Sequence, residues 1–204
     1  MNEGLDTYLV TCSKNSEAGK LLGEDKVIIT PKNREPYTYN TSTYLGWLFA
    51  LTGEDPEKIM HFINLRVSPQ IPDNLEHYKG YLLITPDKFG QVNSLFETKF
   101  IELFGRRIAR DVKTFEELKH AITVIPYEKE MCIQFSDGEN DYDGALLKIP
   151  LPQDASYAAM MAIGYYVIGR IQMQNTPFFK DNIIGYTRRA ASKIFGKGIS
   201  TIVE

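Results

Sequence analysis

Short runs of β-forming residues alternate with helical patterns at the start of the chain. The first run covers residues 8–11, a helical stretch follows at residues 17–22, and a second apolar run covers residues 27–30. An apolar strand without polar alternation is typical of a parallel sheet that is covered on both faces. The β-α-β order of these thirty residues therefore predicts the beginning of an α/β fold.

Two helices are predicted next, and a linker after them. Residues 44–51 are apolar on nearly every helical face and follow hydroxyl side chains that can cap a helix. Another helix begins at Asp55-Pro56, because an aspartate cap followed by proline is a typical helix start. The following segment has two prolines and little periodicity, so we expect a linker over residues 67–79.

The remainder of the chain repeats the strand and helix pattern. Strands are expected at residues 81–85, 131–135 and 145–149, and helices at residues 91–104 and 155–173 and after a capping box at Thr114-Phe115-Glu116-Glu117. We therefore expect an α/β protein with a partial first unit over residues 1–66 and a complete second unit over residues 80–204. Each unit is predicted to be a three-layer α/β/α sandwich around a mainly parallel sheet.

Composition narrows the class of protein. The chain has 204 residues, of which 43% are hydrophobic and 24% charged, as in ordinary folded domains. A formal net charge of −3 provides no overall basic field for nucleic acid. Cys12 and Cys132 are far apart and suggest a reducing compartment without a metal site. Because neither a signal peptide nor a membrane-spanning run is visible, we expect a cytoplasmic protein without membrane contact.

The residues best suited to acid–base chemistry form two short groups. Lys99 and Glu102 lie one helical turn apart in an otherwise apolar helix, and His120 follows Glu117-Leu118-Lys119 further along the chain. A carboxylate, an imidazole and an ammonium group can together move a proton between adjacent carbons of a sugar. From spacing alone, ordinary charges on helix surfaces are the alternative interpretation.

The two groups resemble motifs of the SIS (sugar isomerase) family, especially the isomerase half of glucosamine-6-phosphate synthase and the ketoamine-phosphate deglycases. Lys99-Phe100-Ile101-Glu102 is similar to the Lys-x-x-Glu helix of that family, and Glu117-Leu118-Lys119-His120 to the motif that follows it. The resemblance implies flavodoxin-like units, a homodimer and no metal or organic cofactor. Glu102 would transfer the proton between C1 and C2, His120 would open the sugar ring from the neighbouring subunit, and Lys99 would stabilise the developing negative charge.

The first unit and the C-terminal tail extend the resemblance. Asn40, Thr41 and Ser42 occupy the place where hydroxyl-rich residues open a helix and contact the sugar, and Lys197 that of a tail lysine which closes the site. The phosphate-binding serine loops of the family have no counterpart before Tyr8, so the first unit is expected to be shortened at its N-terminus. Ala121-Ile122 replaces the Gly-Pro that follows the family histidine.

The resemblance implies a phosphosugar aldose–ketose isomerase or a ketoamine-phosphate deglycase, with a sugar phosphate as substrate. One alternative is a non-catalytic phosphosugar-binding or regulatory SIS module, or a fragment of a longer SIS enzyme. Another is an interaction protein, in which the side chains of Lys99, Glu102 and His120 would point to solvent without converging.

Overall fold

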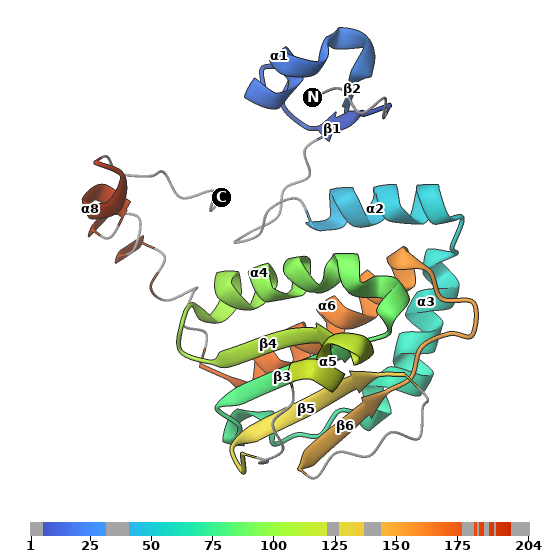
Figure 1. Ribbon diagram of the computed structural model, residues 1–204, viewed down its shortest axis with the longest axis vertical. Helices are drawn as coiled ribbons and strands as arrows, with labels where there is room; N and C mark the ends of the chain where they lie inside the picture. Colours follow the sequence, from blue (N-terminus) through green and yellow to red (C-terminus); the bar gives the residue numbers. More distant parts are fainter. Residues whose placement is uncertain are drawn as a thin grey trace. The chain divides into compact units, whose positions relative to one another are not determined.

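The structure is a computed structural model, and it describes residues 6–31, 41–121, 127–136, 144–176, 182, 184–185, 188–189 and 191–196 (Figure 1). The chain divides into two compact units. Unit 1 consists of Met1–Trp47 and Ile202–Glu204, and unit 2 consists of Leu48–Thr201. The division falls within helix α2 (Thr41–Thr52), and not at the expected linker.

The predicted linker over residues 67–79 lies inside unit 2. Its backbone forms short helical turns, and these are η2 (Ile63–Val67), η3 (Ser68–Gln70) and η4 (Leu75–His77). Val67 and Leu75 are fully buried and Ile71 nearly so. The prolines therefore break the regular helix without separating domains, because the apolar side chains around them pack into the core.

Unit 1 contains the predicted β-α-β start. Strands β1 (Leu9–Thr11) and β2 (Val27–Ile29) pair in parallel, with α1 (Glu17–Leu22) and the turn η1 (Glu24–Lys26) between them. The Ser16 hydroxyl caps α1 by accepting a hydrogen bond from the backbone N–H of Gly19. The two strands have only three residues each, and α1 contains no buried residue.

Unit 2 is built on a four-stranded, fully parallel sheet with the order β4-β3-β5-β6. Its strands are β3 (Gly80–Thr85), β4 (Ala109–Thr114), β5 (Glu130–Phe135) and β6 (Ala145–Ile149). The expected α/β class with mainly parallel sheets is confirmed. The first strand of this sheet lies between the second and third, which is the arrangement of a doubly wound fold.

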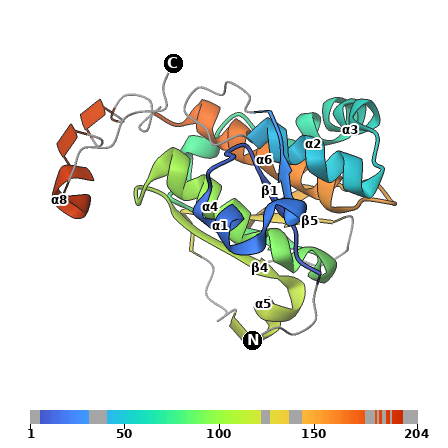
Figure 2. The ribbon, with the colours of Figure 1, turned by 90° about the horizontal axis from the view of Figure 1, so that it is seen from above.

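Helices cover both faces of this sheet (Figures 1 and 2). They are α3 (Pro56–Phe62), η5 (Asp87–Val92), α4 (Asn93–Phe104), α5 (Phe115–Ala121) and α6 (Tyr157–Gln174), and α8 (Ala191–Phe195) follows near the C-terminus. The connection from β3 to β4 runs in one direction along the sheet, and the connection from β4 to β5 runs in the other. Because such crossovers are right-handed, α4 and α5 lie on opposite faces of the sheet. The strands thus separate the two helices.

The face under α4 and α6 carries an aromatic core. The ring of Tyr81 on β3 lies 5.9 Å from that of Phe100, and Phe135 on β5 lies 6.1 Å from Phe96. Gly164 on α6 permits this packing, because a Cβ at that position would overlap the Phe96 ring. Close approach of α4 and α6 therefore depends on a residue without a side chain.

The opposite face carries a smaller apolar cluster under α5. Its buried members come from β3, α5 and β5, and Phe115 and Leu146 pack against them; the buried members are Leu82, Ile84, Leu118 and Cys132. The two clusters use alternate residues of the same strands, because successive side chains of a strand point to opposite faces.

Candidate functional site

Lys99 and Glu102 form an ion pair on α4 that is largely withdrawn from solvent. The Lys99 ammonium donates a hydrogen bond to Glu102 Oε2 at 2.6 Å. The side chain of Lys99 is 10% exposed and that of Glu102 is 21% exposed. The lysine is therefore covered, while the carboxylate keeps an opening toward solvent.

Aromatic rings form part of the cover. The Lys99 ammonium lies 5.3 Å from the centre of the Tyr165 ring on α6, which is within the range of a cation–π interaction. The Tyr165 ring in turn packs edge-on against Phe96 at 5.8 Å. The acid–base pair thus lies where α4 meets α6, and both helices contribute to its surroundings.

The burial of this pair is not a consequence of its spacing. Lys119 and Glu116 form an ion pair at the same spacing on α5, and their side chains are 65% and 62% exposed. Lys20 and Glu17 on α1 form another exposed pair. Because a Lys-x-x-Glu or Glu-x-x-Lys motif can close an ion pair on any helix, burial is what distinguishes the pair on α4 from the other two.

His120 lies away from Glu102 within one chain. It is an exposed residue near the end of α5, on the sheet face opposite to α4. A side chain cannot reach through a packed sheet, so these two predicted residues do not converge in a single copy of unit 2. Any shared site requires His120 of a second copy.

The positions of the other predicted site side chains are not described by the structure. Asn40 and Lys197 lie outside the described residues, as do the side chains of Thr41 and Ser42 at the start of α2. Asn40, Thr41 and Ser42 belong to unit 1, whereas Lys99 and Glu102 belong to unit 2.

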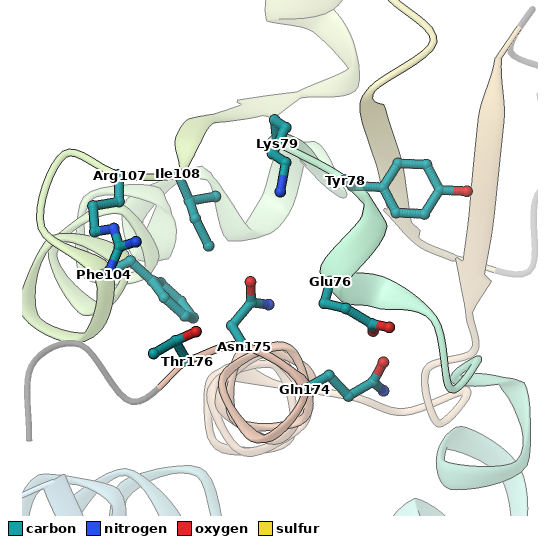
Figure 3. Close-up of a pocket in the computed structure, with 9 residues that line it drawn as sticks. All are labelled: Glu76, Tyr78, Lys79, Phe104, Arg107, Ile108, Gln174, Asn175 and Thr176. Carbon is teal, nitrogen blue, oxygen red and sulfur yellow. The ribbon is translucent and has the colours of Figure 1, made fainter.

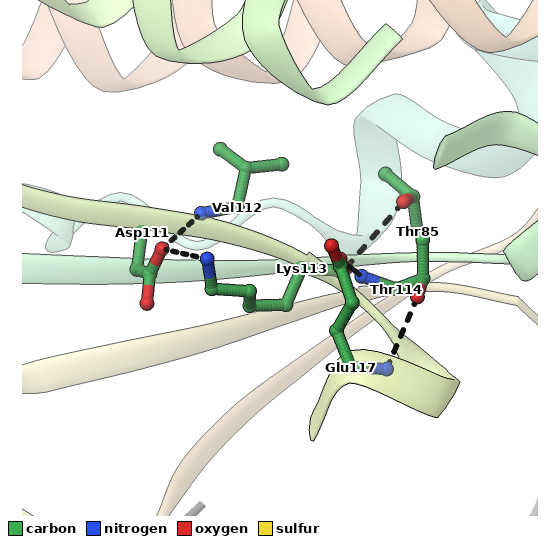
Figure 4. Close-up of polar contacts among 6 residues, drawn as sticks. All are labelled: Thr85, Asp111, Val112, Lys113, Thr114 and Glu117. Carbon is green, nitrogen blue, oxygen red and sulfur yellow. Dashed lines mark hydrogen bonds and ion pairs between the residues drawn. The ribbon is translucent and has the colours of Figure 1, made fainter. Parts of the chain in front are cut away.

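The carboxyl edge of the sheet is where doubly wound folds usually bind ligands. Here the polar groups that follow β3 and β4 hydrogen-bond with one another (Figure 4). Thr114 N–H donates to Glu117 Oε2 at 2.7 Å, and Glu117 N–H donates to Thr114 Oγ1 at 3.2 Å, which confirms the predicted capping box. The buried Thr85 hydroxyl donates to Asn93 Oδ1 at 2.7 Å.

Carboxylates of the chain itself occupy the N-termini of α5 and α6. The backbone N–H of Glu116 donates to Asp87 at 2.9 Å. Glu54 accepts hydrogen bonds from the N–H groups of Ser156 and Ala158 at 2.8 Å and 2.9 Å. A helix N-terminus is a favourable place for a phosphate, but these two already hold an internal anion.

A cavity of about 340 Å³ opens at the amino edge of the sheet (Figure 3). Lys79 and Asn175 point into it from opposite sides, and Glu76 and Arg107 also line it. It lies beside the C-terminal ends of α4 and α6, where cationic side chains complement the helix dipoles. A wider and more open hollow of about 970 Å³ is lined by residues of α3 and η2.

Two buried groups on the sheet have raised pKa values. Burial raises the pKa of the Cys132 thiol to about 12, with a smaller contribution from Glu130. Burial also raises the pKa of the Tyr81 hydroxyl to about 12, and that hydroxyl donates to the carbonyl of Leu75 at 2.6 Å. A thiol that stays protonated at neutral pH is a poor nucleophile, so Cys132 belongs to the core and not to a catalytic site.

Comparisons with protein-family models, with curated proteins and with solved structures found no match to the chain. Over the described segments, no helix combines the length and the apolar character needed to cross a membrane. In those same segments, no three His, Cys, Asp or Glu side chains gather in a way that could hold a metal ion. The burial of the Lys99–Glu102 pair and its aromatic surroundings make it the candidate site.

Both members of the pair could be identified from the sequence, but Tyr165 could not, because it lies within an expected buried helix over residues 155–173. A tyrosine in an apolar helix signals a residue with a polar end, but nothing in the linear pattern indicates that its ring lies over Lys99.

Proposed function

We propose that the chain is a phosphosugar aldose–ketose isomerase or a ketoamine-phosphate deglycase in which Glu102 transfers the proton. The observation that supports this most strongly is the Lys99–Glu102 ion pair, which is shielded from water on the lysine side and open on the carboxylate side. A general base must be accessible to its substrate and must hold a fixed orientation. Glu102 meets both requirements.

In the proposed reaction, Glu102 removes the proton from C2 of the open-chain aldose. The electron pair of the broken C–H bond forms a C1–C2 double bond, and the carbonyl oxygen on C1 receives a proton. Loss of the hydroxyl proton on O2 and return of the first proton to C1 then give the ketose. Acid–base groups alone are sufficient for these steps.

His120 enters the proposal from a second copy of the chain, since it lies on the far face of the sheet from Glu102. It would protonate the ring oxygen and open the ring of the bound sugar phosphate. Lys197, Asn40, Thr41 and Ser42 are proposed as further substrate contacts on the strength of the resemblance alone.

The proposed base is tested by following the exchange of the C2 proton of glucosamine-6-phosphate and of the C1 protons of fructose-6-phosphate in deuterated water by proton NMR. Because removal of a general base lowers a rate about 10²- to 10⁴-fold, we expect Glu102→Gln to abolish measurable exchange. Glu116→Gln is the matched control, since Glu116 is the exposed partner in the corresponding pair on α5. Equal exchange by folded Glu102→Gln and wild-type protein would contradict the proposal.

The role of a second copy is tested by mixing two inactive variants. If Glu102 and His120 of different subunits share a site, a heterodimer of Glu102→Gln and His120→Ala has one intact site. An equal mixture with random exchange of subunits should then recover about a quarter of the wild-type rate. A mixture that stays as inactive as its components argues against a shared site.

The second candidate is a non-catalytic phosphosugar-binding module. It is favoured by the separation of His120 from Glu102 within one chain, which leaves the proposed ring-opening group outside the surroundings of the base. Calorimetric titration with the same sugar phosphates distinguishes it from the enzyme. Binding without proton exchange, and with equal affinity in Glu102→Gln, would support the module.

A further inference from the structure

The two members of the ion pair on α4 differ in accessibility in a way that separates their roles. Lys99 is 8% exposed as a residue, and its ammonium is engaged by Glu102 on one side and by the Tyr165 ring on another. Glu102 has the more exposed side chain of the two. A substrate that approaches the pair therefore meets the carboxylate first.

We infer that Tyr165 is a positioning residue whose ring fixes the Lys99 ammonium, so that the ammonium fixes the Glu102 carboxylate. This inference rests on the proposed function, because it assigns Glu102 as the proton-transfer base. It changes the role expected for Lys99 from direct contact with the reacting sugar to orientation of Glu102.

The geometry supports a chain of three contacts. The ring of Tyr165 is held by an edge-on contact with Phe96 on the neighbouring helix. Its face lies 5.3 Å from the Lys99 ammonium, and that ammonium donates to Glu102 at 2.6 Å. A cation over an aromatic face is attracted by the ring quadrupole, and this attraction strengthens away from water.

This arrangement restricts a side chain that would otherwise rotate freely. A glutamate on a helix surface samples several rotamers. The base can react only in those rotamers that hold its carboxylate close to the substrate proton. An ammonium group that is itself free to move would not restrict it. Because Tyr165 belongs to α6, the orientation of the base depends on the packing of α4 against α6.

The contact between Tyr165 and Lys99 is tested without any substrate. Lysines are methylated with limiting formaldehyde and cyanoborohydride, and the ratio of methylation at Lys99 to that at Lys119 is measured by peptide mass spectrometry. Lys119 is an internal control, since it lies on α5 with a 65% exposed side chain. We expect Tyr165→Leu to raise the ratio about fivefold or more, because the aromatic face is lost, and Tyr165→Phe to keep the wild-type ratio.

Two further variants separate the loss of the ring from general loosening. Ile168→Ala removes buried atoms from α6 one turn beyond Tyr165 without removing the ring, and it should keep a ratio close to that of the wild type. Tyr165→Met fills the space with a flexible side chain and serves if Tyr165→Leu does not fold, as judged by circular dichroism. An unchanged ratio in a folded non-aromatic variant overturns the inference, as does an equal rise in Ile168→Ala.

The effect on the base is measured through the kinetics. Tyr165→Leu should lower kcat about tenfold while KM changes by less than about twofold, since the ring does not contact the substrate. Tyr165→Phe should retain the wild-type kcat. If Glu102→Gln is inactive but Tyr165→Leu keeps full kcat, the positioning role is wrong and the proposed function stands. If the wild-type protein shows no exchange, the proposed function fails, and the methylation ratio still decides the contact.

Discussion

The two faces of the sheet in unit 2 are each covered by a helix with a Lys–Glu ion pair, and the two pairs differ in their exposure to solvent. Helix α4 on one face and α5 on the other each hold a lysine and a glutamate three residues apart, and both pairs are closed. On α4 the side chains of Lys99 and Glu102 are 10% and 21% exposed. On α5 the side chains of Lys119 and Glu116 are 65% and 62% exposed. Identical spacing therefore produces a shielded acid–base pair in one place and surface charges in the other.

The difference arises from what lies against each helix. Helix α4 packs against the sheet and also against α6, which has 18 residues and brings Tyr165 over Lys99. Helix α5 has seven residues and contacts a small cluster on the strands. The strand residues on its side include the ion pair of Asp111 with Lys113 at 3.2 Å (Figure 4). A second covering helix is therefore what converts a surface motif into a candidate site.

The strongest test of the comparison removes the aromatic core of the α4 face. Phe96 is fully buried between the sheet and α6, so Phe96→Ala should lower the free energy of unfolding by about 4 kcal/mol. Leu95→Ala on the exposed side of the same helix is the matched control, and it should change stability by less than about 1 kcal/mol. Chemical denaturation followed by circular dichroism measures both. Equal losses in the two variants would contradict the assignment of this face as the main core.

A smaller loss is expected on the α5 face. Leu118 is 8% exposed and contacts a cluster of only a few side chains, so Leu118→Ala should lower the free energy of unfolding by about 2 kcal/mol. The same denaturation experiment compares it with Phe96→Ala. A loss as large as that of Phe96→Ala would show that the two faces contribute equally.

Alkaline unfolding reports on both faces, because Tyr81 lies on the α4 side and Cys132 on the α5 side. Both groups have folded pKa values of about 12, above their ordinary values of 10.0 and 9.0. The unfolded chain therefore loses these protons first, so their contribution to stability is complete below pH 9 and declines as the pH rises toward 12.

By the upper end of this window the decline should be about 2 kcal/mol for Tyr81 and about 4 kcal/mol for Cys132, because each pKa unit between the folded and unfolded states corresponds to about 1.4 kcal/mol. Stability measured from pH 8 to pH 12 in wild type, Tyr81→Phe and Cys132→Ala checks this. Each substitution should make the alkaline decline shallower. A slope that is unchanged in both variants would show that other groups cause it.

The smallest effect is expected for the ion pairs. Lys99→Met leaves the Glu102 carboxylate unpaired in a largely covered place, and should lower the free energy of unfolding by about 1–2 kcal/mol. Lys119→Met removes the exposed partner of Glu116 and should cause no measurable change. Thermal unfolding of the two variants side by side gives the comparison. A larger loss in Lys119→Met would reverse the distinction between the two faces.

Much of the fold could be predicted from local pattern. The β-α-β start, strands β3, β5 and β6, the Asp55 cap and the capping box of α5 all follow from short-range chemistry, and the structure confirms them. Strand β4 shows no such pattern, because three of its six residues, Arg110, Asp111 and Lys113, are charged and the strand lies at the sheet edge. It forms there because β3 provides a complete set of backbone partners.

The segment predicted as a linker lies inside unit 2 for a related reason. Prolines and weak periodicity indicate irregular backbone, but they do not indicate whether that backbone lies on a surface or in a core. Val67, Ile71 and Leu75 are spaced four residues apart and are buried in unit 2. The division after Trp47 falls within a continuous helix, where the isolated Gly46 is not accompanied by proline or by a cluster of polar turn residues.

Local sequence by itself determined the α/β class, the helix caps and the closure of the Lys99–Glu102 pair, because each depends on residues a few positions apart. Tertiary structure decided which of two equivalent ion pairs is shielded, which aromatic ring lies over its lysine, and on which face His120 lies. These features depend on the order of strands β3, β4 and β5 in the sheet and on the packing of α6 against α4. Both bring together residues from distant parts of the chain. No local pattern specifies those distances.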